Sequence, residues 1–285
     1  MDFSREGTPA RPRAAHTPRH VDSDVLRGML DTCDIAVAYQ PIVSLADRTV
    51  WGCEALLRGH TDALGAIPPT VLVESAVQAH LLDAVTRDVM TQALDVAGQL
   101  RAVSGVPVTM TLNLESSQFR ADSTLLEWLV ARVDTLGVPV VLELSERQPM
   151  RWDAEDDRLA DELATHGIGI GLDDLGAGQS RLTLIGHRSW DLVKLDRGLL
   201  LEDHGGRGPV VLRHAAAILE EYGIVGTLVE GIETAEQEEL ALALGIRYGQ
   251  GNGLAAAMSP ADLLGLARAG LVVPRIGQAP IKQRR

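Results

Sequence analysis

Two adjacent carboxylates, Asp173 and Asp174, end the apolar segment IGLDD and are followed closely by Gly176 and Gly178. Two carboxylates held together at the end of a buried strand repel each other, and one tends to take up a proton unless a cation lies between them. Carboxylate oxygens are the ligands that the hard cations Mg²⁺ and Mn²⁺ prefer. The pair therefore predicts a metal site.

Strand-like and helical patterns alternate along most of the chain. Helical patterns such as STLLEWLVARVDTL and AEQEELALALG separate eight strand-like runs, which are IAVAYQPIVSL, VWGCEALLRG, VTMTLNLE, VVLELSE, IGIGLDD, LVKLD, TLVEGI and RYGQG. This order predicts an α/β fold, a TIM-type (β/α)8 barrel. Only ADRT joins the first two strands, which is too short for a parallel crossover helix. We therefore expect an irregular barrel with one antiparallel strand.

Side-chain alternation indicates which residues face the barrel lumen, because residues two apart on a strand share a face. In VTMTLNLE the polar set Thr109, Thr111 and Asn113 should line the lumen, while the apolar residues between them should meet the helices. The same phase places Asp173 on one face with two glycines that leave space below it. Asn113 and Asp173 should thus lie at the C-terminal mouth.

The other strands each direct a polar group toward the same mouth. These groups are Glu54 and Arg58, Glu143, Lys194 with Asp196 in phase, Glu230 and Gln250. Any one of them alone is commonly a solvated loop residue or a helix cap. Barrel enzymes, however, assemble their sites from several strand ends at this face. Taken together, the set predicts a functional site.

Length and composition limit the number of domains that the chain can form. The chain has 285 residues, of which 46% are apolar, so it can bury one large domain. We expect a barrel domain at 23–273, between a disordered Pro- and Arg-rich tail at 1–22 and a basic tail at 274–285. Only Cys33 and Cys53 are present, which excludes a disulfide scaffold and predicts reduced thiols.

Charge and hydropathy narrow the possible partners. A net charge of −13 argues against a protein that grips a nucleic-acid polymer, because that work needs a basic surface. The N-terminus has no apolar signal core, and no later apolar run is long and uncharged enough to span a bilayer. The sequence therefore predicts a cytoplasmic protein without a membrane span.

Eight short motifs occur in one order between residues 36 and 260. They are YQPI, EALLRG, TLNLESS, LELSE, LDDLGAGQSRL, DLVKLD, LVEGIET and QGN. In this order they resemble the EAL-domain cyclic-di-GMP phosphodiesterases, which are named for the triplet that here is Glu54-Ala55-Leu56. The resemblance implies a homodimeric barrel enzyme that opens cyclic di-GMP to linear pGpG with two Mg²⁺ or Mn²⁺ ions.

The resemblance also implies roles for individual residues. One metal would be held by Glu54, Asn113, Glu143 and Asp173. Asp173 would bridge to a second ion, which Asp174 and Glu230 help to hold. Lys194 would contact the attacking water, and Gln250 would support the site near Glu230. Arg58 and Gln40 would bind the substrate, Glu146 would brace the loop after Asp174, and Asp196 and Glu233 would support the ligands from behind.

The chain departs from the family pattern near these motifs. Leu175, Ala177, Gln179 and Arg181 stand in the segment after the aspartate pair, where the family usually has an aromatic residue and small residues. Gly59 and Asn252 replace a usual Trp and Tyr. Fewer aromatic faces are then available to stack on guanine, a contact worth about 1–3 kcal/mol per base.

Two alternatives to a cyclic-di-GMP phosphodiesterase therefore stay open. The first is a catalytically weak or inactive EAL domain that acts as a cyclic-di-GMP receptor or as a protein-interaction module. The second is another metal-dependent barrel hydrolase.

Overall fold

The computed structural model describes residues 20–145, 152–177, 182–201 and 207–277. Within this part of the chain, nine strands form one sheet. The strands are β1 Ile35–Ser44, β2 Val50–Thr61, β3 Gly65–Ile67, β4 Thr109–Leu114, β5 Val140–Ser145, β6 Ile168–Leu175, β7 Leu192–Leu195, β8 Thr227–Val229 and β9 Tyr248–Gly249.

The sheet closes into a barrel of eight strands. Its order is β1-β9-β8-β7-β6-β5-β4-β2-β3, and β1 also pairs with β2, which completes the ring. β1 runs antiparallel to both of its neighbours, while the pairs from β2–β4 round to β8–β9 are parallel. The predicted irregular TIM-type barrel with one antiparallel strand is confirmed, and that strand is β1.

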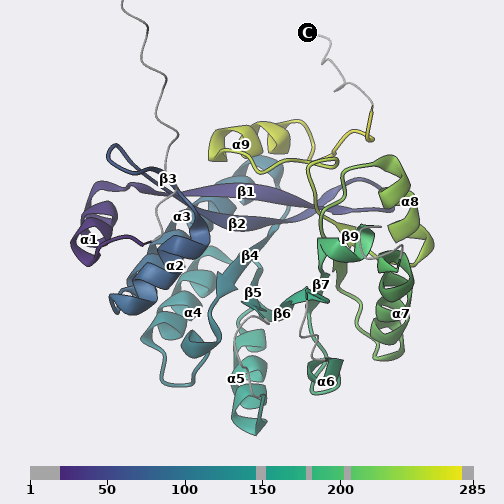
Figure 1. Cartoon of the computed structure of the whole chain (residues 1–285), viewed down its shortest axis with the longest axis horizontal. Helices are drawn as coiled ribbons and strands as arrows, with labels where there is room; N and C mark the ends of the chain where they lie inside the picture. Colours follow the sequence, from purple (N-terminus) through teal and green to yellow (C-terminus); the bar gives the residue numbers. More distant parts are fainter. Residues whose placement is uncertain (1–19, 146–151, 178–181, 202–206, 278–285) are drawn as a thin grey trace, which may run out of the picture.

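Helices form an outer layer around the strands (Figure 1). The described α-helices are α1 Ser23–Thr32, α2 Pro69–Gln78, α3 Leu82–Ser104, α4 Thr124–Leu136, α5 Ala154–Thr165, α6 Leu182–Ile185, α7 Gly208–Glu221, α8 Ala235–Ala243 and α9 Pro260–Arg268. Two 3₁₀ turns, η1 Ser116–Gln118 and η2 Arg197–Leu200, follow β4 and β7. None of the described helices combines the length and apolarity that crossing a membrane requires.

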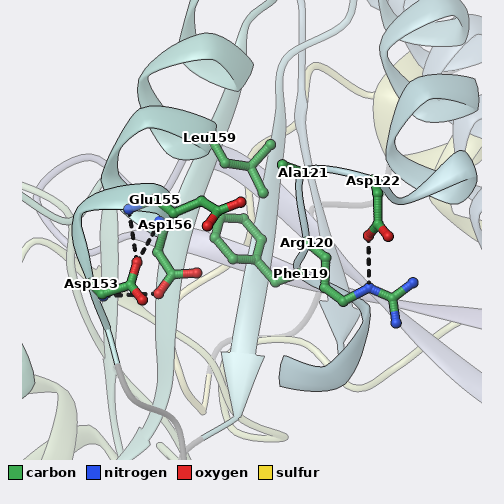
Figure 2. Close-up of a pocket in the computed structure, with 8 residues that line it drawn as sticks. All are labelled: Phe119, Arg120, Ala121, Asp122, Asp153, Glu155, Asp156 and Leu159. Atoms are coloured by element: carbon green, nitrogen blue, oxygen red, sulfur yellow. Dashed lines mark hydrogen bonds and ion pairs between the residues drawn. The ribbon is translucent and has the colours of Figure 1, made fainter.

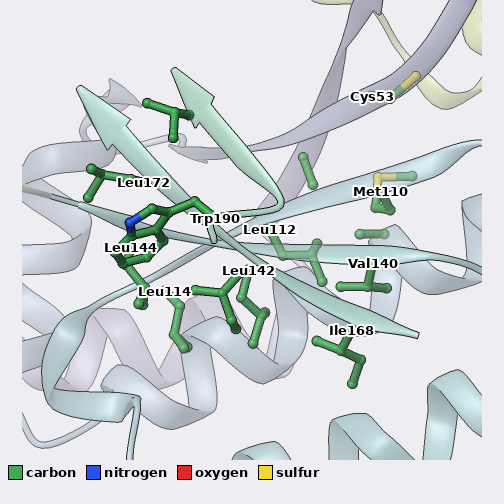
Figure 3. Close-up of a cluster of buried hydrophobic side chains, with 14 of the residues drawn as sticks. Cys53, Met110, Leu112, Leu114, Val140, Leu142, Leu144, Ile168, Leu172 and Trp190 are labelled. Atoms are coloured by element: carbon green, nitrogen blue, oxygen red, sulfur yellow. The ribbon is translucent and has the colours of Figure 1, made fainter. Parts of the chain in front are cut away.

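The main core lies between the strands and the helices. Met110, Leu112 and Leu114 of β4 belong to it, as the alternation of VTMTLNLE predicts. Figure 3 shows the side chains of β4 and β5 in this cluster, among them Leu142. A separate apolar cluster fills the lumen with Ile42, Val141, Leu192, Leu228 and Tyr248. The polar site thus rests on a packed floor.

Two features were not expected from the sequence. β3 pairs antiparallel with the outer part of β2 and lies outside the barrel ring. Val21, in the segment expected to be a tail, is fully buried, and its backbone amide donates to Ser75 Oγ at 2.9 Å. Residues 1–19 and 278–285, most of the two predicted tails, lie outside the described residues.

Candidate metal centre

Lys194 lies at the centre of a group of carboxylates. Its Nζ atom is 2.7 Å from Glu230 Oε1 and 3.1 Å from Glu54 Oε2, Glu143 Oε2 and Asp173 Oδ1. The Lys194 residue is only 1% exposed. With Asp174, these four acids form what we call the acidic cluster: Glu54, Glu143, Asp173, Asp174 and Glu230. Five carboxyl groups against one ammonium leave an excess of negative charge.

Glu54 is held by neutral amides as well as by Lys194. Asn113 Nδ2 donates to Glu54 Oε1 at 3.0 Å, and Gln250 Nε2 donates to Glu54 Oε2 at 2.8 Å. β2 pairs with β4, and Glu54 stands beside Thr111 in the register. Asn113 is two residues further along β4, so it shares a face with Thr111. The parallel pairing therefore brings the two side chains together, and both oxygens of the carboxylate are fixed.

A β-bulge in β6 explains how two adjacent aspartates can serve one site. Leu172 pairs with Val193 and Leu175 with Leu195, so Asp173 and Asp174 together stand opposite the single residue Lys194. Asp174 has a φ of 60°, a left-handed conformation that Asp tolerates better than most residues. A regular strand would send the two side chains to opposite faces. The extra residue lets both reach the mouth, which side-chain alternation alone does not predict.

The donor set fits divalent metal ions. Carboxylate oxygens of Asp173, Asp174 and Glu230 lie within 4.8 Å of one another, close enough to share an ion. Glu143 Oε1 is a buried oxygen that accepts no hydrogen bond among the described residues, and Asp173 Oδ1 has only the ion pair with Lys194. An all-oxygen set of this kind suits Mg²⁺ or Mn²⁺ and lacks the sulfur and imidazole ligands typical of zinc.

Burial and mutual repulsion make part of the acidic cluster reluctant to ionise. Burial raises the pKa of Glu143 well above its usual range despite the attraction of Lys194, and it raises the pKa of Asp173 for the same reason. Burial likewise raises the pKa of Glu230 to about 7, with Lys194 opposing the rise. Added positive charge would favour the ionised forms of these three groups.

Glu54 and Lys194 behave in the opposite way. Burial works against ionisation of Glu54, but Lys194 and the two amides outweigh it and lower the pKa of that carboxyl. Burial alone would lower the pKa of Lys194, but four carboxylates raise that pKa well above its usual range. The Lys194 amine is therefore protonated, and it can donate hydrogen bonds but cannot act as a base.

The other predicted site residues lie outside this group. Arg58 is exposed, and its Nη1 donates to the carbonyl of Leu57 at 2.8 Å. The Asp196 side chain accepts from Gly198 N at 2.8 Å and caps η2. Glu233 is exposed, and none of the described contacts joins its side chain to the acidic cluster. Glu146 lies outside the described residues.

Gln40 is closer to the cluster than its predicted substrate role suggests. Its Oε1 accepts from Gln250 Nε2 at 3.2 Å, and its Nε2 donates to the carbonyl of Ala255 at 3.2 Å. The register of β1 and β2 places Gln40 directly beside Glu54. The sequence gives no sign of the Ala255 contact, because it depends on the path of the chain after β9.

The structure also explains one departure from the family pattern. At Gly59, where the family usually has a Trp, any Cβ atom would collide with Leu72 Cδ1 of α2. Gly59 is buried in β2 beneath this helix. The missing aromatic side chain is thus replaced by an apolar contact from α2, and simple restoration of Trp at Gly59 would disturb that packing.

A pocket of about 590 Å³ lies apart from the acidic cluster. Phe119, Leu159 and neighbouring residues from the β4–α4 connection and the start of α5 line this pocket, as Figure 2 shows. Asp122 in it is paired with Arg120, and Asp153 caps α5 by accepting from Glu155 N and Asp156 N. Asp122 and Asp153 thus already have structural partners, and none of the acidic-cluster residues lines the pocket.

Sequence comparisons connect this geometry with known proteins. The family described as EAL domain matches residues 23–257. The chain is 29% identical over 222 residues to the probable cyclic di-GMP phosphodiesterase PdeN of Escherichia coli (strain K12), covering 75% of this chain and 42% of PdeN. It is 28% identical over 251 residues to the cyclic di-GMP phosphodiesterase RocR of Pseudomonas aeruginosa, covering 87% of this chain and 62% of RocR. The chain therefore spans less than two thirds of the length of either relative.

Solved structures agree on the fold. The EAL enzyme Bd1971, in its cAMP- and cyclic-di-GMP-bound form, superposes with a TM-score of 0.77 at 22% identity, covering 86% of this chain and 68% of that one. The PaMucR phosphodiesterase in complex with c-di-GMP gives a TM-score of 0.76 at 24% identity, covering 84% and 98%. The chain forms a barrel of this topology, and the family model matches most of its residues. The chain therefore belongs to the EAL domain family.

Proposed function

We propose that this protein is a metal-dependent phosphodiesterase that hydrolyses cyclic di-GMP to linear pGpG with two Mg²⁺ or Mn²⁺ ions. The observation that carries the proposal is the acidic cluster at one mouth of the barrel, in which four carboxyl groups surround Lys194 and a fifth, that of Asp174, lies within 4.8 Å of two of them. Among the similar proteins, RocR is described as a cyclic di-GMP phosphodiesterase and PdeN as a probable one.

The acidic cluster and Asn113 would share the binding of two ions. Glu54, Asn113, Glu143 and Asp173 would hold one ion, and Asp173, Asp174 and Glu230 the other. When bound, such a pair of ions activates water and compensates the charge that develops on the phosphate. Gln250 keeps the Glu54 carboxylate in place through its 2.8 Å hydrogen bond.

Lys194 has a donor role in this proposal. Because four carboxylates keep it protonated, it can hydrogen-bond the attacking water or a phosphate oxygen and so orient it. Arg58 is exposed and has no carboxylate partner among the described residues, so its guanidinium is available to a substrate phosphate. Gln40 lies beside Glu54, and the family resemblance implies a substrate contact for it. Asp196, through its cap on η2, and Glu233 would support the ligand-bearing segments, and Glu146 would brace the loop after Asp174.

A turnover assay tests the proposal. Purified protein with Mn²⁺ should convert cyclic di-GMP to pGpG, measured by liquid chromatography, and EDTA should stop the reaction. Glu143→Gln should abolish turnover while retaining the fold, because the amide resembles the protonated carboxyl that burial favours. Gln92→Met is the control. Gln92 lies on α3, on the helix side of β1 and away from the acidic cluster, so this variant should keep full activity. Equal turnover in EDTA would contradict the proposal.

Binding without cleavage would favour a receptor. If calorimetry shows that the protein binds cyclic di-GMP with Ca²⁺ or Mn²⁺ but produces no pGpG, the receptor alternative replaces the enzyme. If it hydrolyses bis-nitrophenyl phosphate and leaves cyclic di-GMP intact, the activity is that of another metal-dependent hydrolase.

An exposed apolar surface on α7 supports a homodimer as a further part of the proposal. Val211 is 49% exposed and Tyr222, at the end of the helix, is 57% exposed. With the partly buried Ile218 they follow a helical spacing and form one stripe. The Tyr222 hydroxyl lies near Gly186, so this end of the stripe lies beside the residues just after α6.

Light scattering after gel filtration tests the dimer. Val211→Glu should convert a dimer to a monomer, because it places a charge in the apolar stripe. Val103→Glu makes the same change at an exposed valine of α3 and should leave the dimer intact. A monomeric wild-type protein would contradict this part of the proposal.

A further inference from the structure

A chain of side-chain hydrogen bonds joins the acidic cluster to the loop after β9. Gln250 Nε2 donates to Glu54 Oε2 at 2.8 Å and to Gln40 Oε1 at 3.2 Å. Gln40 Nε2 in turn donates to the carbonyl of Ala255 at 3.2 Å. Gln250 is 3% exposed, so little solvent competes for these contacts.

The donor and acceptor roles along this series of hydrogen bonds follow from the groups at its two ends. The carbonyl of Ala255 can only accept, so Gln40 must direct its NH₂ group toward Ala255 and its oxygen toward Gln250. An ionised Glu54 can also only accept, so Gln250 must direct its NH₂ group toward Glu54. Both hydrogens of the Gln250 amide are then used, and both glutamines are fixed in one orientation without any choice between amide flips.

The loop at the far end is itself attached to β1. Met258 exchanges two backbone hydrogen bonds with Tyr39, at 2.8 and 2.9 Å, and Tyr39 directly precedes Gln40. The amide of Ala255 donates to Gly251 O at 2.9 Å, which closes a short turn directly after Gln250. Gln40 therefore lies beneath a loop that is held on both sides, and its amide has little freedom to rotate.

The orientation of Gln250 leaves one atom unused. Gln250 Oε1 is buried and accepts no hydrogen bond among the described residues. A buried oxygen without a partner costs free energy, and the loss is avoided when a donor or a cation binds there. Without Gln40, the second amide hydrogen of Gln250 would lose its acceptor, and the amide would be held only by its hydrogen bond to Glu54.

We propose that Gln40 is a positioning residue of the metal centre: it fixes the Gln250 amide and thereby holds the Glu54 carboxylate in the orientation that binds metal. This role rests on the proposed metal-dependent function, and it differs from the direct substrate contact that the family resemblance implies for Gln40. It also makes the loop at 251–258 part of the support of Glu54.

Calorimetric titration of Mn²⁺ into the protein without substrate tests the proposal. Gln40→Met keeps the length of the side chain but removes both hydrogen bonds, and it should weaken Mn²⁺ binding about tenfold, the size usual for groups that orient a metal ligand. Gln92→Met is the matched control. Gln92 also donates its amide to a backbone carbonyl of β1, Ile35 O at 3.0 Å, but on the helix side. It should change Mn²⁺ affinity by less than about twofold.

A double-mutant cycle tests whether Gln40 acts through Gln250. In a Gln250→Met background, Gln40→Met should weaken Mn²⁺ binding by less than about twofold further, because the residue through which it acts is gone. If the two losses multiply, Gln40 acts independently and the proposal is wrong. If Gln40→Met weakens cyclic-di-GMP binding and leaves Mn²⁺ binding unchanged, Gln40 is a substrate contact instead.

A metal-free measurement separates this proposal from the proposed function. The side-chain NH₂ resonances of Gln250, identified by their loss in Gln250→Met, should exchange slowly with water in the wild type and much faster in Gln40→Met. That change would support the positioning role even in a protein that binds no Mn²⁺ and cleaves nothing, a result that would contradict only the enzyme proposal. Unchanged exchange in Gln40→Met would overturn the positioning role.

Discussion

Asp173 and Asp174 are adjacent in the sequence, yet both stand opposite the single residue Lys194 in the register, because β6 carries one residue more than β7 at this point. The left-handed backbone of Asp174, at φ 60°, is part of the same bulge. The second carboxylate of the proposed metal centre thus depends on a local backbone conformation as much as on residue type.

This dependence predicts different outcomes for two substitutions that remove the same charge. Asp174→Asn should keep the stability of the metal-free protein, because Asn tolerates the left-handed conformation. Asp174→Ala should cost about 1 kcal/mol more, since Ala is less favourable there. Both variants should lose most of the increase in the free energy of unfolding that Mn²⁺ gives the wild type. Denaturant unfolding without and with Mn²⁺ measures the two effects, and equal stability of the variants would show that the bulge does not constrain this position.

Lys194 should matter most when no metal is present. Lys194→Met leaves buried carboxylates without their cation and should destabilise the metal-free protein by about 3–5 kcal/mol. Saturating Mn²⁺ should recover part of this loss, because it supplies positive charge to the same oxygens.

The chain offers a matched control, because Lys282 is its only other lysine. Lys282→Met makes the same substitution outside the described residues, and its denaturation midpoints with and without Mn²⁺ give the reference for the Lys194 variant. A Lys194→Met protein as stable as the wild type in EDTA would contradict the assignment of Lys194 as the balancing cation.

Metal binding should depend on pH through Glu230. Its pKa rises from 4.5 to about 7 in the metal-free fold, so between these values the folded protein binds a proton that the unfolded chain does not. This contribution to stability is complete below pH 4.5 and is lost as the pH rises toward 7. Mn²⁺ must displace that proton below pH 7, so its affinity should fall from pH 8 to pH 6.

Calorimetry in two buffers of different ionisation enthalpy measures this proton release. The wild type should release protons on binding Mn²⁺ at pH 6 and fewer at pH 8. In Glu230→Gln the difference between the two pH values should shrink. An unchanged difference would assign the released protons to other carboxyl groups of the cluster.

The two cysteines should differ sharply in reactivity. Cys53 is fully buried, and burial raises the pKa of its thiol to about 12, whereas Cys33 is exposed. Only the thiolate reacts readily, so a thiol reagent at pH 8 should label Cys33 quickly and Cys53 only when the barrel opens. Labelling of the Cys33→Ser variant then measures opening around β2. Fast labelling of that variant under native conditions would contradict the packing of Cys53.

Much of this architecture follows from simple patterns in the sequence. The short ADRT connection correctly predicts the antiparallel pairing of β1 with β2, because no crossover helix fits in it. Alternation correctly separates the lumen face of β4 from its helix face. Both predictions depend on local geometry that every strand shares.

The remaining features depend on relationships that no local pattern contains. Alternation applied to β6 gives Asp173 a place at the mouth but assigns Asp174 to the other face, because a bulge has no clear sequence signal. In LVKLD the phase groups Asp196 with Lys194, yet the Asp196 side chain turns to cap η2 as the strand ends. The contact between Gln40 and Ala255 joins residues more than two hundred positions apart and requires the closed barrel.

The pairing of β1 with β9 has a consequence for synthesis on the ribosome. β1 can form a hairpin with β2 early, but its other neighbour β9, which places Gly249 opposite Val43, emerges only after β3 to β8 have been made. Until then one edge of the hairpin is open and can pair with other chains. Gln250, which holds Glu54, arrives with that last strand. Before β9 has emerged, a nascent chain therefore cannot assemble the complete metal centre, and cations can stabilise the finished site only after the barrel has closed.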